Sequence, residues 1–196
     1  MAEPFRLSVD EINYLVVAVL VTAAAFIAFS GALNLENTVL YILVAAAVLG
    51  VREFGQRTIA QWMEADVDLS LSMEGSMLTV LGAFLAVLTN LPVIMLFSVS
   101  NSFLLKDYVH WGKSIDAMWM KREAWIAYGG IGALLIGGFI TSFFEVSMLT
   151  NAFFLFTMFQ LLPFDNDGIP TGTLDGSYVL KQNGFYWLIF MFLSLI

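Results

Sequence analysis

The sequence predicts an all-α integral membrane protein that forms a single domain over residues 1–196. Hydrophobic residues make up 60% of the chain and charged residues 12%, whereas soluble domains average roughly half apolar and a quarter charged residues. Several apolar runs also reach about 20 residues, the length at which a helix crosses the hydrocarbon core of a bilayer. From these runs we expect five to six transmembrane helices in a lipid bilayer.

Composition also excludes several kinds of site. The chain has no cysteine and one histidine, His110, so it lacks disulfides, thiolate metal sites and the imidazoles from which zinc sites are usually built. The net charge is −8, and no basic stripe that could neutralise phosphates occurs, which argues against nucleic acid as a partner. No cluster of Lys or Arg in the sequence indicates recognition of anionic lipids.

The first two expected helices cover residues 14–33 and 38–63. The first lacks the small-residue cleavage site of a signal peptide, so we expect it to be retained. The second carries Arg52, Glu53 and Gln56, and at about 1.5 Å per residue Arg52 lies about 20 Å into it. Ionised side chains at that depth are costly and persist where they have a partner or a function.

Residues 66–75 alternate apolar and polar side chains, which predicts a short membrane-associated strand or hairpin. The apolar stretch 76–105 is long for one span and is interrupted near Pro92, so it is either one tilted helix or a re-entrant pair of half-helices. The pair is favoured because it puts six cations on one side, as the positive-inside rule requires of the cytoplasmic face, and it predicts a cytoplasmic N-terminus. The six are Arg6, Arg57, Lys106, Lys113, Lys121 and Arg122.

Two more helices are expected at residues 124–144 and 148–162, and a final apolar run at 185–196. The first of these helices is rich in glycine, which permits close helix packing. The final run is long enough to reach only about half way across a bilayer.

A set of motifs begins in the charged half of the second helix. Arg52-Glu53-Phe54-Gly55-Gln56 has the spacing of H-E-x-x-H, the zinc signature of metalloproteases. After it come the strand-like segment, the glycine-rich residues 128–132, Gln160-Leu-Leu-Pro163 and Leu174-Asp175-Gly176. Over about residues 10–190 this order resembles the site-2 protease family of intramembrane zinc metalloproteases, in its small archaeal and bacterial type. The resemblance implies the cell membrane of a prokaryote, a zinc ion held by two histidines and an aspartate, and Glu53 as the general base.

The departures from the family pattern fall on the metal ligands. Arg52 and Gln56 stand in place of the two histidines, and Asp175 remains at the aspartate position. A guanidinium has no lone pair and an amide oxygen is a poor zinc ligand, so we expect no metal, no other cofactor and no catalytic residue. An insertion makes Asp167 a second candidate for the aspartate position. The residues expected to line a binding cleft are Gln160, Pro163 and Asp167.

Two interpretations of Arg52 stay open. Its cation either takes the place of the metal beside Asp175, or extends to the membrane interface and contacts nothing specific. Glu53 is expected to be a buried carboxyl paired with a neighbouring arginine, and Gln56 to hydrogen-bond within this cluster. The strand at 67–73 either pairs with an extended peptide or is covered by loops of its own chain.

These features predict a catalytically inactive membrane protein that binds transmembrane segments or serves as a subunit or scaffold of a membrane complex. One alternative is an active intramembrane metalloprotease with an atypical site, in which Glu53, Asp175 and Asp167 surround Mg²⁺, Ca²⁺ or Mn²⁺. Another is a transporter or channel component, because broken helices and buried charges are typical of those proteins.

Overall fold

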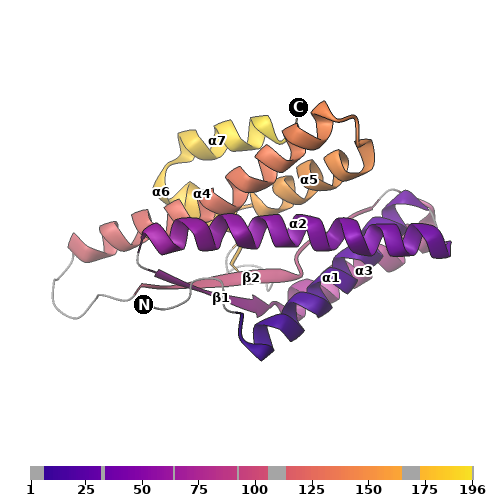
Figure 1. The fold of residues 1–196 in the computed structure, drawn as a ribbon, viewed down its shortest axis with the longest axis horizontal. Coiled ribbons are helices and arrows are strands. Elements are labelled where there is room, and N and C mark those ends of the chain that lie inside the picture. Colours follow the sequence, from indigo (N-terminus) through magenta and orange to yellow (C-terminus); the bar gives the residue numbers. More distant parts are fainter. Residues whose placement is uncertain are drawn as a thin grey trace.

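A computed structural model places one long helix, α2 (Leu35–Trp62), between two groups of elements (Figure 1). On one side pack α4 (Ser114–Phe143) and α5 (Ser147–Gln160), and on the other lie α1 (Val9–Ser30) and a two-stranded sheet. The structure describes residues 7–31, 34–63, 65–91, 93–105, 114–164 and 173–195. The remaining elements are β1 (Ala65–Leu71), α3 (Met73–Thr89), β2 (Val99–Leu105), α6 (Asp175–Gln182) and α7 (Gly184–Leu193).

The ends of α1 are set by two local signals. Ser8 Oγ accepts a hydrogen bond from the Glu11 backbone N–H at 3.1 Å, and the Glu11 carboxylate accepts one from the Ser8 N–H at 2.8 Å. This capping box satisfies N–H groups that the helix leaves free, so α1 begins at Val9 rather than at residue 14. At the other end Gly31 adopts the left-handed conformation, with φ of 66°, and stops the helix.

Three helices of the described residues are long and apolar enough to cross a membrane. They are Val9–Ser30, Leu35–Trp62 and the part of α4 from Lys121 to Phe143. The helices α3 and α7 are also apolar, but both are shorter than the roughly 20 residues that a span needs. Length and composition are therefore consistent with association with a membrane, and the count of five to six spans stays a prediction.

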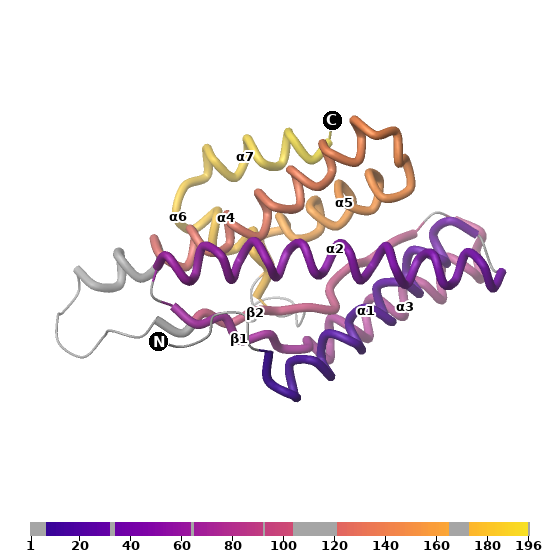
Figure 2. The backbone as a smooth tube through the Cα atoms, viewed as in Figure 1, coloured from indigo at the N-terminus to yellow at the C-terminus, as the bar shows by residue number. Residues whose placement is uncertain are grey.

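The stretch 76–105 is neither one helix nor a pair of half-helices, so both sequence interpretations are wrong in its second half. The helix α3 ends at Thr89 and is capped by Asn90, which has a φ of 52°. Residues 93–98 are neither helix nor strand, and β2 follows them. β2 pairs antiparallel with β1, with Leu69 opposite Asn101. Figure 2 follows this reversal, which leaves α3 beside α1.

The side-chain pattern of β2 explains why it is a strand. Val99, Asn101 and Phe103 are buried, whereas Ser102 is exposed and Ser100 is half-buried. A period of two suits a strand with one covered face and does not suit a helix. This strand was not predicted, because its pattern follows directly on a long apolar run.

The strand predicted at 66–75 is confirmed in its first part. β1 ends at Leu71, because Ser72 caps α3 by accepting a hydrogen bond from the Gly75 N–H at 3.0 Å. The helix α6 was not predicted, since its residues are mostly polar and follow a polar segment.

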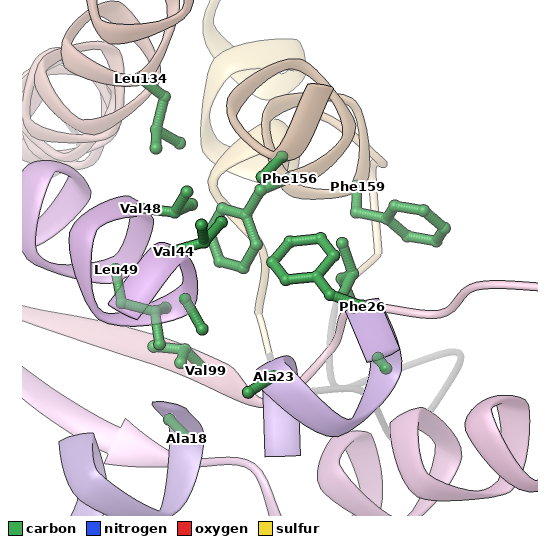
Figure 3. Close-up of a cluster of buried hydrophobic side chains, with 14 of the residues drawn as sticks. Ala18, Ala23, Phe26, Val44, Val48, Leu49, Val99, Leu134, Phe156 and Phe159 are labelled. Carbon is green, nitrogen blue, oxygen red and sulfur yellow. The ribbon is translucent and has the colours of Figure 1, made fainter. Parts of the chain in front are cut away.

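The larger hydrophobic core lies where α1, α2, α5 and β2 meet (Figure 3). Phe156 of α5 lies beside Val44 and Val48 of α2, and Leu49 lies beside Val99 of β2. All five side chains are buried. Arg52 therefore follows one helical turn after a residue of this core.

Glycines let α2 and α4 approach closely. A Cβ added to Gly55 would lie 2.3 Å from the carbonyl oxygen of Gly129 and 2.5 Å from Cβ of Ala133, and one added to Gly129 would lie 2.5 Å from Cγ1 of Ile59. The packing role predicted for the glycine-rich helix is confirmed at Gly129. By contrast, a Cβ on Gly132 would meet no atom within 4 Å.

The difference in space around Gly55 and Gly132 provides a matched pair of alanine variants. Gly55→Ala is expected to lower the free energy of unfolding by about 1–3 kcal/mol, because the added methyl must push two helix backbones apart. Gly132→Ala is expected to be neutral or to stabilise by about 0.5–1 kcal/mol through its better helix propensity. Thermal unfolding of the purified proteins in detergent measures both, and equal stability of the two variants would contradict the close approach.

Candidate functional site

The candidate site is built on the second half of α2. Arg52 and Gln56 are four residues apart, so both side chains project from the same face of the helix. Asp175, at the start of α6, lies opposite them. Gly176 allows this placement, because a Cβ there would lie only 2.1 Å from the carbonyl oxygen of Leu161. The motif Leu174-Asp175-Gly176 therefore lets α6 pack against the end of α5 and places Asp175 against α2.

Arg52 forms a two-pronged ion pair with Asp175. Its Nε donates to Oδ2 at 3.0 Å and its Nη2 donates to Oδ1 at 2.9 Å, and Gln56 Nε2 donates to the same Oδ1 at 2.8 Å. Arg52 and Gln56 are fully buried, and Asp175 is 1% exposed. Of the two interpretations of Arg52, pairing with Asp175 is confirmed and extension to the interface is wrong.

Glu53 is held from two sides. Arg52 Nη1 donates to its Oε1 at 2.9 Å, and Asn101 Nδ2 of β2 donates to the same oxygen at 2.7 Å. Asn101 also donates to Gln56 Oε1. The expected pairing of Glu53 with an arginine and the expected hydrogen bond of Gln56 are confirmed. Asn101 itself was not predicted, because it was assigned to a membrane helix.

A second ion pair continues from this group to α1. Arg57 Nη2 donates to Glu11 Oε1 at 2.5 Å, and its Nε lies 3.7 Å from Glu53 Oε2. Glu11 Oε1 also accepts the backbone N–H of Leu69 at 3.2 Å. Sequence reasoning missed Glu11, although its place three residues after Ser8 identifies it as a capping residue. We call the whole set the polar cluster: Glu11, Arg52, Glu53, Gln56, Arg57, Asn101 and Asp175.

Burial imposes a desolvation cost on the charged side chains of the polar cluster. All of its members are less than 9% exposed, and a buried ion is stable only when it is paired and hydrogen-bonded. Burial raises the pKa of the Asp175 carboxyl above its ordinary value, and the contacts with Arg52 and Gln56 act in the opposite direction. The two-pronged geometry thus offsets part of the cost of burying this carboxyl.

Of the remaining predicted residues, the structure describes Gln160 and Pro163. Gln160 is fully buried, and within the described part of the chain neither of its side-chain amide atoms has a hydrogen-bond partner. Pro163 is exposed, and Asp167, like His110, lies outside the described residues. The binding cleft expected from Gln160, Pro163 and Asp167 therefore stays a prediction.

The donor chemistry of the polar cluster does not fit zinc. Both oxygens of Asp175 accept hydrogen bonds from Arg52 or Gln56, and those two side chains present N–H donors where a metal needs lone pairs. Among the described residues no group of three or more His, Cys, Asp and Glu side chains is arranged to hold a metal ion. No step of chemistry through a metal is therefore derived for this site.

Comparison with models of protein families, with curated proteins and with solved structures found no match to this chain. The resemblance to site-2 proteases thus rests on the order of the motifs alone. Its consequences for function are proposals.

The pairing of Arg52 with Asp175 can be measured with a double-mutant cycle. Arg52→Leu is expected to destabilise the protein by about 3–5 kcal/mol, because it leaves a carboxylate buried without its cation. The double variant Arg52→Leu/Asp175→Leu should cost clearly less than the sum of the two single variants. Unfolding in detergent gives the four stabilities, and strictly additive losses would show that the two side chains do not interact.

Proposed function

We propose that this chain is a catalytically inactive membrane protein with the plan of a site-2 protease, and that it binds transmembrane segments as a subunit or scaffold of a membrane complex. The observation that carries the proposal is the ion pair between Arg52 and Asp175. In the family pattern, those two positions and that of Gln56 would hold the metal. Here a guanidinium supplies the positive charge instead.

The loss of hydrolysis follows from what a guanidinium lacks. Zinc lowers the pKa of a bound water and so creates a nucleophile near neutral pH. Arg52 has no coordination site for water, and its donors are engaged by Asp175 and Glu53. Glu53 Oε1 accepts hydrogen bonds from Arg52 and Asn101, which favours a structural over a catalytic role.

The distribution of charge supports a membrane placement with one orientation. One end of the molecule consists of the α1–α2 turn, the end of α3 and the α4–α5 turn. This end carries Glu36 and Glu145, and the sequence places no Lys or Arg there. Among the described residues, Arg57, Lys121 and Arg122 fall toward the other end, where Lys121 begins the apolar part of α4. We propose that this cation-bearing end is cytoplasmic, in the cell membrane of a prokaryote. Three of the six cations of the sequence argument, Arg6, Lys106 and Lys113, lie outside the described residues.

The strand β2 adjoins the polar cluster, and its outer edge is covered: Val99, Asn101 and Phe103 are 1%, 2% and 5% exposed. Leu69 of β1 donates its N–H to Glu11 and not to β2, so the pair Leu69–Asn101 is a non-hydrogen-bonded pair of the ladder. The backbone groups of Val99, Asn101 and Phe103 then point away from β1, and no other described residue forms a backbone hydrogen bond with them. An unwound segment of a partner would pair there as an added strand, next to the polar cluster, only after displacing what covers this edge.

Introducing the two histidines of the family pattern tests whether the site has the arrangement of a metal site. The variant Arg52→His/Gln56→His is expected to bind one zinc or cobalt ion, because Asp175 Oδ1 already lies within 2.9 Å of the side chains at both positions. The triple variant with Asp175→Asn serves as control and should bind at least tenfold more weakly. Metal analysis and cobalt absorption spectra of the purified proteins give the readout. Chelator-sensitive cleavage of a helical membrane substrate by the natural chain would overturn the proposal.

The partner surface is tested by site-specific photo-crosslinking in native membranes. A crosslinking residue at Ser102, exposed on β2, should join the chain to a transmembrane segment of another protein. The matched position is Phe84, which is 58% exposed on α3. Crosslinks to one partner from Phe84 but not from Ser102 would place the binding surface elsewhere.

A further inference from the structure

One side chain of α1 lies on the outer edge of the sheet. Glu11 Oε1 accepts the N–H of Leu69 at 3.2 Å, and this N–H is on the side of β1 that faces away from β2. The helix α1 packs against β1, and Figure 1 shows its first turn beside the strand. The carboxylate therefore takes the place that a backbone carbonyl of a further strand would occupy.

Two further contacts hold Glu11 in this position. Its Oε2 accepts the Ser8 N–H at 2.8 Å as part of the capping box, and its Oε1 accepts a hydrogen bond from Nη2 of Arg57. Glu11 and Arg57 are both buried. A hydrogen bond between two ionised groups is stronger than one between neutral groups. Moving Glu11 off the edge of β1 therefore requires an ion pair with α2 to break.

The rest of this edge has the backbone geometry that an added strand needs. Val67 and Leu71 lie two residues from Leu69 on either side, so their backbone groups also face away from β2. Among the described residues, no other segment forms a backbone hydrogen bond with Val67 or Leu71. An unpaired strand edge is a template for pairing with another chain, and natural proteins cover such edges. Here the cover at Leu69 is a side chain of α1.

We propose that the contact of Glu11 with Leu69 is autoinhibitory: it closes the outer edge of β1, and its release opens that edge to an extended segment of a partner protein. The inference rests on the function proposed above, because it names where the unwound part of a bound transmembrane segment lies. A backbone carbonyl of that segment replaces the carboxylate at the Leu69 N–H, and its neighbours pair with Val67 and Leu71. An extended segment within a bilayer needs such pairing, since no water is present there to satisfy its backbone groups.

Release of Glu11 leaves no buried cation alone. Arg57 Nε lies 3.7 Å from Glu53 Oε2, so Arg57 keeps a carboxylate beside it when Glu11 withdraws. Glu11 is in the first turn of α1, next to the exposed Asp10, where a movement of this turn brings its carboxylate into water. Because both charges stay compensated, opening avoids the large cost of an unpaired buried ion.

Peptide binding by the intact purified protein in detergent tests this inference. The probe is a fluorescent peptide with the sequence of residues 65–71, and the control peptide is methylated at alternate backbone nitrogens so that it cannot pair as a strand. Glu11→Ala is expected to bind the probe about tenfold or more tightly than the natural chain, because a closed site lowers the apparent affinity by its open fraction. Deuterium exchange of the Leu69 amide, which reports local opening, should rise by a similar factor. The matched controls Asp10→Asn, a charge change at the exposed neighbour, and Ser8→Ala, which weakens the helix cap alone, should behave like the natural chain.

A second variant keeps the test valid where Glu11→Ala alone fails to fold. Glu11→Ala/Arg57→Met removes both charges, leaves no unpaired cation in the interior and should bind the probe as tightly as Glu11→Ala. The inference is overturned if both variants bind the probe no better than the natural chain, or if the methylated peptide binds equally well. Faster exchange at Leu69 without peptide binding also overturns it, because the edge then opens without receiving a strand. The proposed function is judged separately, by chelator-sensitive cleavage, so each proposal fails on its own measurement.

Discussion

The burial of Arg52 is the constraint on which the rest of the structure depends. A guanidinium stays charged and carries five N–H donors, so it can lie inside a protein only where acceptors surround it. Asp175 and Glu53 supply those acceptors, while Gln56 and Asn101 satisfy the same carboxylates from other directions. One side chain therefore joins α2 to α6 directly and to β2 through its partners. The geometry that places it depends in turn on close helix approach at glycine positions.

The ion pairs continue beyond Arg52 in an alternating order of charge. Asp175, Arg52, Glu53, Arg57 and Glu11 follow one another across α6, α2 and α1, so each charge has an opposite neighbour. Glu11 also holds β1 by accepting a backbone N–H. A polar cluster of this kind ties five elements together. In the proposed function, the position that serves metal chemistry in site-2 proteases serves cohesion here.

Parts of this site were predictable because they depend on local order along the chain. Arg52 and Gln56 share a helix face by their spacing alone, and a buried arginine in an apolar helix demands a carboxylate. The motif order then pointed to Asp175 over 100 residues away. Asn101 and Glu11 were not predictable in the same way, because their roles depend on a strand and a helix end that pack against α2 from other parts of the chain.

The sequence by itself determined that the chain is mostly helical and apolar, that α2 carries ionised residues deep within it, and that no imidazole pair is present for zinc. Those properties follow from composition and from helical periodicity, which are local. Only the tertiary structure decided that residues 99–105 form a strand and that Asp175 meets Arg52 with both oxygens. These features depend on which distant parts of the chain pack together. Packing and the pairing of buried charges determine that arrangement, and neither can be deduced from a single segment of the sequence.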